Sequence, residues 1–128
     1  MRIAISTGGG DAPGLNAVIR ATTLSAINRG WDVLGIKRGF AGLLGEDEVI
    51  PLTRESVRGI AHLGGTILRS TNRGSPFHYP VRQPDGSYVE IDRSDELVET
   101  AKRLGIDAIV TIGGDGSLEI AQRLVDKG

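Results

Sequence analysis

The sequence has no cysteine among its 128 residues, and this absence excludes disulfide bonds, thiolate catalysis and metal sites built on cysteine. Its two histidines, His62 and His78, do not have the paired spacing of a metal-binding motif. No apolar run approaches the ~18 residues that a membrane-spanning helix needs, and residues 2–6 lack the basic and apolar regions of a signal peptide. We therefore expect a soluble, cytoplasmic protein that has no membrane partner.

An excess of charge of one sign is also missing, because the net charge is −1 and the isoelectric point is near 6.1. This balance lacks the broad positive potential that nucleic acid binding usually needs, so we expect no nucleic acid partner. An anionic ligand would have to be held by a local site. Arginine supplies 12 of the 15 cationic side chains, and its planar fork suits contacts with phosphate or carboxylate groups. The composition permits a phosphate ligand without requiring one.

Glycine, in contrast, is abundant, with 19 residues or roughly twice its average share. The glycines gather beside apolar segments, at residues 8–10, 39–45, 64–65 and 113–116. This placement indicates turns at the ends of strands and helices, and it does not resemble a flexible linker.

The order of apolar segments and turns predicts an α/β protein. A buried strand at 2–6 is followed by a glycine loop at 7–14 and a helix at 15–30. A second strand at 32–37 completes a βαβ unit, which favours a parallel sheet with right-handed crossovers. The predicted fold therefore has three layers, a mainly parallel sheet with helices on both faces.

The rest of the chain continues this alternation. We expect an extended piece at 48–52 and strands at 66–70 and 107–112. Helices are expected at 53–65 and 94–105, with N-caps at Thr53 and Ser94, and a final helix ends the chain. A β-hairpin insertion is expected near 79–91, with its turn at 84–86. The last helix stands where a further strand would be due. We therefore expect the chain to be a fragment of a longer protein.

Two segments share one order of features, an apolar strand, a glycine–aspartate loop and a helix. They read AISTGGGDAPG at 4–14 and IVTIGGDGS at 109–117. In a parallel sheet both loops emerge at the carboxyl ends of their strands, where open α/β sheets bind ligands and helix N-termini attract anions. Either motif alone fits a tight connection about as well, and both lack the P-loop lysine and the GxGxxG pattern. Two copies at equivalent ends of one sheet favour a phosphate site.

The charged residues of these loops and of a neighbouring segment make the chemistry more specific. A carboxylate beside a phosphate is repulsive unless a cation lies between them, so Asp115 predicts a magnesium ion. The same reasoning is weaker for Asp11, which could equally cap the helix that follows it. Arg69 and Arg73 follow a predicted strand, so at least one could neutralise phosphoryl charge at this edge. The ordinary alternative for either arginine is a solvated or ion-paired surface side chain.

Four motifs, in this order, resemble the N-terminal part of the 6-phosphofructokinase family. They are GGDAPGLNAVIR at 9–20, GFAGLL at 39–44, GGTIL at 64–68 with PF at 76–77, and IGGDGS at 112–117. The resemblance covers essentially all of the chain. It implies the Rossmann-like N-terminal domain of that family, with residues 1–128 forming its nucleotide-binding part and ending before the motif that carries the catalytic base.

The resemblance implies glycolytic transfer of the γ-phosphoryl group of Mg-ATP to the 1-hydroxyl of fructose 6-phosphate, giving fructose 1,6-bisphosphate. ATP would be the co-substrate, Mg²⁺ the cofactor, and the longer parent an allosteric homo-oligomer, either a tetramer or a dimer. The chain alone would be inactive, because the base that takes the hydroxyl proton lies elsewhere. Two alternatives stay open: a pyrophosphate-dependent member of the family, or a non-catalytic nucleotide-binding fragment.

The positions that match the family motifs imply the site residues. Asp115 matches the magnesium-binding aspartate, and Gly10 matches a glycine whose backbone lies against the ATP phosphates. The nucleotide contacts on either side of Asp115 fall on Gly114, Gly116 and Ser117. Gly116 also points to ATP as the phosphoryl donor, because pyrophosphate-dependent relatives have an aspartate there that blocks the nucleotide.

Two further positions complete the implied nucleotide site. Phe40 matches a residue near the adenine side of the cleft. Arg73, with Gly74 after it, matches the arginine that spans ATP and fructose 6-phosphate and stabilises the transferring phosphoryl group. The segment is slightly shifted from the commoner family pattern, so Arg69 stays the alternative.

The resemblance also covers an effector pocket. Arg20 and Arg54 match two of its arginines in bacterial allosteric members, and a third would fall at Leu24. The leucine weakens the case for regulation by ADP and phosphoenolpyruvate. The hairpin near 79–91 is longer than in compact bacterial members, which indicates a different subgroup.

Overall fold

A computed structural model describes residues 1–8, 14–44, 49–69, 76, 79–113 and 115–126, with the backbone alone for 79, 80 and 115–118. The helices are α1 (Leu15–Asn28), α2 (Ser94–Arg103) and α3 (Asp115–Asp126), with a short 3-10 helix, η1 (Ala41–Leu44). The strands are β1 (Arg2–Thr7), β2 (Asp32–Ile36), β3 (Val49–Pro51), β4 (Tyr79–Arg82), β5 (Tyr88–Ile91) and β6 (Ala108–Ile112). Over these residues, none of the helices combines the length and apolar character required to cross a membrane.

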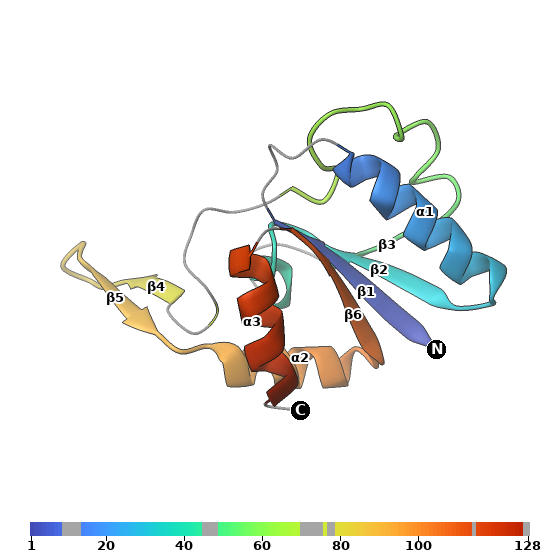
Figure 1. Ribbon diagram of the computed structural model, residues 1–128. Coiled ribbons are helices and arrows are strands. Elements are labelled where there is room, and N and C mark those ends of the chain that lie inside the picture. Colours follow the sequence, from blue (N-terminus) through green and yellow to red (C-terminus); the bar gives the residue numbers. More distant parts are fainter. Residues whose placement is uncertain (9–13, 45–48, 70–75, 77–78, 114, 127–128) are drawn as a thin grey trace.

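Four strands form one sheet in the order β3-β2-β1-β6 (Figure 1). β1 lies parallel to both of its neighbours, β2 and β6, whereas β3 is antiparallel to β2. The parallel pairing of β1 with β2 requires a crossover, and α1 provides it across one face of the sheet. The prediction of a mainly parallel sheet is confirmed.

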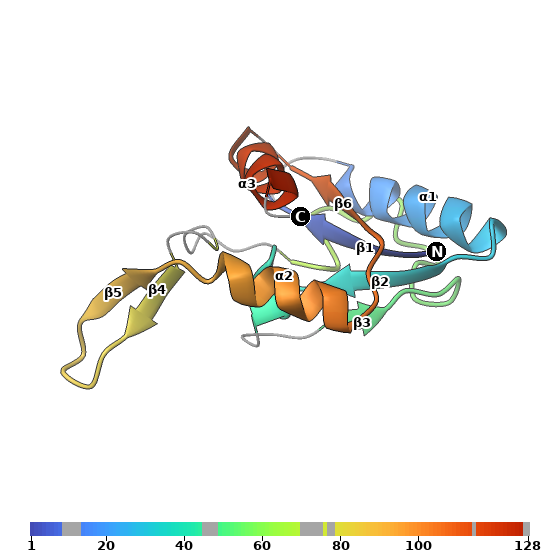
Figure 2. The same ribbon diagram turned by 90° about the horizontal axis from the view of Figure 1, so that it is seen from below.

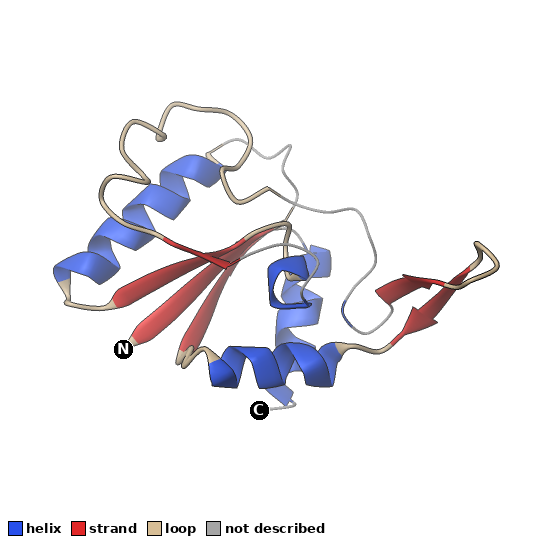
Figure 3. Cartoon of the chain, turned by 180° about the vertical axis from the view of Figure 1, so that it is seen from behind, coloured by secondary structure: helices blue, strands red, loops and turns tan. Residues whose placement is uncertain are grey.

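Both faces of this sheet are covered. Along β1, Ile3 and Ile5 pack into the apolar cluster on the α1 side, whereas Ala4 packs into the cluster on the α2 and α3 side. This alternation is the two-residue period of a strand that is buried on both faces. Figures 2 and 3 show α1 on one face, and α2 and α3 on the other. The predicted three-layer α/β architecture is therefore confirmed.

The segment at 53–65 departs from the predicted elements, because it forms turns and no helix. Thr53 and Ser56 do form a helix-cap pair: the Ser56 amide donates to Thr53 Oγ1 (3.2 Å), and the Thr53 amide donates to Ser56 Oγ (2.7 Å). The turn ends at Gly59, whose φ of 73° lies in the left-handed region that stops a helix. The helix prediction is wrong because this glycine interrupts the segment one turn after the cap.

The strand predicted at 66–70 is also wrong over its described part, residues 66–69. The Ile67 amide donates to Asn16 Oδ1 (2.7 Å), and the Leu68 amide donates to Thr66 Oγ1 (3.1 Å). Side chains thus occupy the amides that a strand ladder would need.

The predicted hairpin insertion is confirmed as β4 and β5, which pair antiparallel and extend away from the sheet (Figure 1). Its turn closes through the Gln83 amide, which donates to the Ser87 carbonyl oxygen (2.7 Å). The chain then enters α2 at Ser94. Ser94 is not the N-cap that the sequence predicted, because Arg93 takes that position and its carbonyl oxygen accepts the Leu97 amide (3.1 Å), the first hydrogen bond of the helix.

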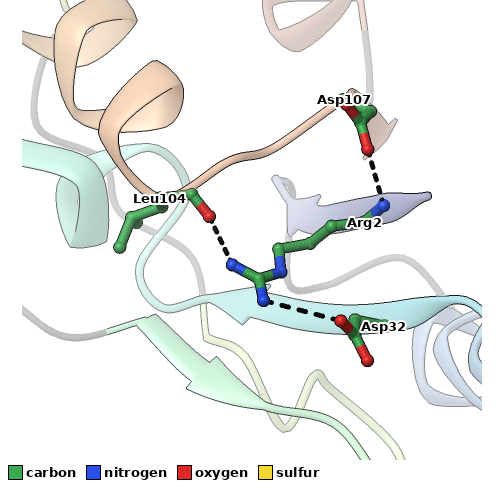
Figure 4. Close-up of polar contacts among 4 residues, drawn as sticks. All are labelled: Arg2, Asp32, Leu104 and Asp107. Atoms are coloured by element: carbon green, nitrogen blue, oxygen red, sulfur yellow. Dashed lines mark hydrogen bonds and ion pairs between the residues drawn. The ribbon is translucent and has the colours of Figure 1, made fainter.

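Arg2, the first residue of β1, contacts Asp32, Leu104 and Asp107 at the amino ends of the strands (Figure 4). Its guanidinium donates to the Leu104 carbonyl oxygen (2.6 Å), just beyond the last turn of α2, where a cation also stabilises the helix dipole. The same guanidinium lies 3.5 Å from the Asp32 carboxylate. The Arg2 amide donates to Asp107 Oδ2 (2.8 Å). These contacts tie β1 to the first residue of β2 and to the segment that leads from α2 into β6.

β2 lies close to residues 52–68 because Gly35 has no side chain. A Cβ atom on Gly35 would lie 2.5 Å from Leu68 Cδ2 and 3.3 Å from Leu52 Cδ1. Both leucines are buried, so they have little room to move aside. The glycine therefore lets this segment pack directly on the sheet.

We expect Gly35→Ala to lower the free energy of unfolding by about 1–3 kcal/mol, because overpacking displaces buried leucines from their rotamers. Urea denaturation of the two proteins measures the difference. Gly64→Ala is the matched control: a Cβ there meets nothing within 4 Å, and its effect should stay within about 0.5 kcal/mol. Equal stability of Gly35→Ala and the parent would contradict the close packing.

Candidate functional site

The carboxyl ends of β1 and β6 lie side by side at one edge of the sheet. Thr7 pairs with Ile112 at the ends of the two strands, and the Gly8 amide donates to the Ile112 carbonyl oxygen (2.8 Å). Each strand continues there into one of the two glycine–aspartate loops. The prediction that both loops leave the sheet at the same edge is therefore confirmed for the residues that flank them.

Two helices begin close to these strand ends. α1 follows Gly14, which caps the helix with a φ of 83° and without a side-chain hydrogen bond. α3 begins at Asp115, soon after β6 ends. The first amides of a helix have no partner within the helix and carry the positive end of its dipole. This edge therefore provides backbone donors for an anion.

Several of the predicted site residues lie outside the described residues, namely Gly10, Asp11, Arg73, Gly74 and Gly114. Asp115, Gly116 and Ser117 are described as backbone only, in the first turn of α3. The position of Asp115 at the start of a helix fits the predicted role, but the roles of all these residues remain predictions.

Two arginines lie on turns next to this edge. The Arg38 amide, just after β2, donates to the Leu68 carbonyl oxygen (2.8 Å), so the turn that carries Arg69 lies beside the turn that follows β2. Arg38 and Arg69 both have left-handed backbone, with φ values of 55° and 60°. This conformation costs a residue with a side chain about 1 kcal/mol, so surrounding contacts must hold both turns. Arg38 is a cation at this edge that the sequence did not single out.

Buried polar side chains hold the turn at 63–69, and the prediction from the sequence did not include them. Thr7 is fully buried, and its hydroxyl donates to the Arg69 carbonyl oxygen (3.1 Å) and bonds to Thr66 Oγ1 (2.9 Å). Asn16 is 2% exposed and bonds to the backbone of the same turn. The apolar pattern of the sequence could have indicated both residues: Thr7 is a polar residue at the end of an apolar strand, and Asn16 is a polar residue on the apolar face of the helix.

Phe40 lines a cavity of about 270 Å³ between β6, α2 and α3. The walls are mainly apolar, and Phe40, which is 8% exposed, packs in the core cluster with Leu97 and Leu124. Phe40 thus lies on the face of the sheet opposite to α1. Its predicted place near the adenine stays a prediction.

Arg93 connects three segments on this face. Its amide donates to the Pro76 carbonyl oxygen (2.7 Å), and its guanidinium donates to the Leu44 carbonyl oxygen (2.7 Å) at the end of η1. The guanidinium also donates to both carboxylate oxygens of Glu96 (2.9 and 2.7 Å). These hydrogen bonds hold the pKa of Glu96 below its ordinary value of 4.5.

The lowered pKa of Glu96 predicts a pH dependence of stability. A carboxyl group whose pKa is lower in the folded state stabilises the fold above its unfolded pKa, and it loses this effect as the pH falls through the folded pKa. We expect Glu96→Gln to be less stable than the parent at pH 7 and the difference to shrink below about pH 4.5. Urea denaturation across pH 3–7 measures it, with the exposed Glu99→Gln on the same helix as the control. A difference independent of pH would contradict the prediction.

The predicted effector arginines lie on the α1 side. Arg54 is exposed and donates to Asn28 Oδ1 (2.5 Å) at the end of α1. Arg20 precedes Asn28 by eight residues on the same helix, about 12 Å along its axis at 1.5 Å per residue. Leu24 packs against the core cluster between them. An effector role for Arg20 and Arg54 remains a prediction.

Among the described residues, no group of three or more His, Cys, Asp or Glu side chains is placed to hold a metal ion. Mg²⁺ is usually held by one or two carboxylates together with phosphate oxygens and water. The predicted magnesium role of Asp115 needs only one such carboxylate, and it stays a prediction.

Comparison with known sequences gives a family. The sequence model of the family Phosphofructokinase matches residues 2–128. ATP-dependent 6-phosphofructokinase 2 of Clostridium perfringens is 51% identical over 128 residues, which cover 99% of this chain and 35% of that protein. ATP-dependent 6-phosphofructokinase 1 of Nostoc sp. is 45% identical over 128 residues, which cover 99% of this chain and 34% of that protein. The chain spans about a third of the length of these curated relatives.

Two solved phosphofructokinase structures share this fold. The crystal structure of Pichia pastoris phosphofructokinase in the T-state has a TM-score of 0.80 at 37% identity, covering 98% of this chain and 12% of that chain. The structure of phosphofructokinase from Saccharomyces cerevisiae has a TM-score of 0.74 at 34% identity, covering 98% of this chain and 16% of that chain.

Proposed function

The chain belongs to the phosphofructokinase family, and from this we propose that it supplies the Mg-ATP side of a site that phosphorylates fructose 6-phosphate. The observation that carries the proposal is the meeting of β1 and β6 at one edge, where the Gly8 amide bonds to the Ile112 carbonyl oxygen and both glycine–aspartate loops begin. The curated relatives named above are ATP-dependent 6-phosphofructokinases, which supports ATP as the donor. The γ-phosphoryl group of ATP would pass to the 1-hydroxyl, giving fructose 1,6-bisphosphate, ADP and a proton.

Each proposed residue has one task. The backbone of Gly10 and the first amides of α3, including those of Gly116 and Ser117, would bind phosphate oxygens. The Asp115 carboxylate would hold Mg²⁺, which when bound neutralises phosphate charge. Arg73 would stabilise the charge that spreads over the transferring group. Gly114 and Gly74 would let the backbone lie close to the nucleotide.

We also propose that residues 1–128 are the nucleotide-binding part of a larger N-terminal domain. The base that takes the proton of the 1-hydroxyl, and the groups that hold fructose 6-phosphate, would lie in the rest of that protein. The isolated chain should therefore transfer no phosphoryl group. Homo-oligomerisation and a cytoplasmic location belong to the same proposal for the longer protein.

A chimera tests the proposed activity. Residues 1–128 would replace the matching segment of the C. perfringens relative, which is 51% identical over this length. Formation of fructose 1,6-bisphosphate is measured with Mg-ATP and, separately, with Mg-pyrophosphate, and the unaltered relative is the control. We expect turnover with ATP. Turnover with pyrophosphate alone would contradict the choice of donor, and a folded chimera that binds Mg-ATP without turnover would indicate a nucleotide-binding module.

A further inference from the structure

We propose that Thr7 and Asn16 are positioning residues, which fix the turn at 63–69 relative to both ends of the first glycine loop. Thr7 precedes that loop at the end of β1, and Asn16 follows it in the first turn of α1. The inference rests on the proposed function, because the turn carries Arg69 and the chain continues from it to Arg73. Thr7 and Asn16 would act through the backbone of the turn and would not contact the substrate.

Thr7 belongs to a chain of hydrogen bonds in which each donor and acceptor can be assigned. A hydroxyl has a single proton, and the Thr7 hydroxyl donates its proton to the Arg69 carbonyl oxygen (3.1 Å). The Thr66 hydroxyl must therefore donate to Thr7 Oγ1 (2.9 Å), while Thr66 Oγ1 accepts the Leu68 amide (3.1 Å). Thr7 is fully buried, so water cannot readily replace its hydroxyl. Loss of this one group would break the chain at its centre.

Asn16 uses both ends of its side-chain amide on the same turn. Its Nδ2 group donates to the carbonyl oxygens of Leu63 (3.2 Å) and Gly64 (3.3 Å). Its Oδ1 atom accepts the Ile67 amide (2.7 Å). The two donated bonds and the accepted bond also assign the orientation of the amide, since a flipped Asn16 would face two carbonyl oxygens with its own oxygen. The first turn of α1 therefore holds the beginning of the turn, and β1 holds its end.

This arrangement links the proposed phosphate loop to the arginine-bearing turn. The Arg69 carbonyl oxygen is held by Thr7 although the Arg69 backbone is in the left-handed region, with φ at 60°. Catalysis by a phosphoryl-stabilising arginine depends on its position relative to the bound phosphates, and a displacement of about 1 Å can cost about a hundredfold in rate. The two positioning residues would thus affect the transition state more than ground-state ATP binding.

Thr7→Val and Thr7→Ser in the active chimera test the inference. Valine keeps the shape of threonine and removes the hydroxyl, whereas serine keeps the hydroxyl. We expect Thr7→Val to lower kcat at least about tenfold and to change the KM for ATP less than about twofold. Thr7→Ser should have a kcat close to that of the parent chimera. In the isolated chain, hydrogen exchange at the Leu68 and Arg69 amides should be faster in Thr7→Val only. Thr66→Val interrupts the same chain of hydrogen bonds if Thr7→Val does not fold.

The outcomes separate this inference from the proposed function. An active chimera in which Thr7→Val keeps its kcat would overturn the positioning role and leave the proposed function intact. An inactive parent chimera would instead count against the proposed function. In that case hydrogen exchange in the isolated chain still tests the inference. Unchanged protection of the Leu68 and Arg69 amides in Thr7→Val would overturn it, and faster exchange would support the role of Thr7 in fixing the turn.

Discussion

Gly116→Asp in the active chimera should lower kcat/KM for ATP at least about a hundredfold. The substitution puts a carboxylate in the first turn of α3, at the edge proposed to bind the ATP phosphates. Two like charges 4 Å apart near a protein surface repel each other by about 4 kcal/mol, and 1.36 kcal/mol corresponds to a factor of ten in rate. The resemblance to the family leads to the same expectation, because pyrophosphate-dependent relatives have an aspartate at this position.

A coupled assay at varied ATP concentration measures this effect, and Gln122→Glu is the control. Gln122 is exposed farther along the same helix, so its substitution adds a carboxylate to α3 away from the proposed site. The control should keep its kcat/KM for ATP within about twofold. If Gly116→Asp used ATP as well as the parent chimera, Gly116 would not select the donor.

Asn16→Asp should be the most destabilising of the substitutions considered, lowering the free energy of unfolding by about 3 kcal/mol or more. The aspartate is nearly isosteric with asparagine, but it replaces the Nδ2 donor with an oxygen that faces the carbonyl oxygens of Leu63 and Gly64. The position is 2% exposed, so the new carboxylate would be desolvated as well. Urea denaturation at pH 7 measures the loss.

The matched control is Asn28→Asp, which makes the same chemical change on the same helix. Asn28 is exposed, and its Oδ1 atom accepts a hydrogen bond from Arg54, so a carboxylate there keeps its partner. We expect the control to stay within about 0.5 kcal/mol of the parent. If Asn16→Asp matched it, the hydrogen bonds of Asn16 would not hold the turn.

The sequence predicted the elements whose signals are local. Strands with continuous apolar character, a glycine stop at Gly30 or Gly105, and the proline–glycine turn of the hairpin each depend on a few neighbouring residues. The right-handed crossover rule then made a parallel sheet with helices on both faces the expected result. The structure confirms this architecture.

The turn at 63–69 could not be predicted in the same way. Its conformation depends on Asn16 and Thr7, which lie 47 to 62 residues away in the sequence. The same segment packs on β2 only because Gly35 leaves room for Leu68. Local periodicity indicates a strand at 66–70, but Asn16 accepts the Ile67 amide and Thr7 donates to the Arg69 carbonyl oxygen, and these distant contacts hold a turn instead.

The site was predictable in its chemistry more than in its supporting contacts. Two glycine–aspartate loops after apolar strands indicated a phosphate site, and the structure places the flanking residues Gly8 and Ile112 in contact. The roles of Asp115 and Arg73 stay predictions. Arg38 and the buried hydroxyl of Thr7 were missed because neither belongs to a motif with a local spacing.

A calorimetric titration of the isolated chain with ATP tests the central claim, that residues 1–128 hold Mg-ATP, most directly. It is run with Mg²⁺, with EDTA, and with Mg²⁺ on Asp115→Asn, which keeps the size of the side chain and removes its charge. We predict binding that depends on Mg²⁺ and weakens at least about tenfold in Asp115→Asn, since the carboxylate is the proposed ligand of the ion. Absence of ATP binding by the folded chain, or binding that neither EDTA nor Asp115→Asn changes, would contradict the claim.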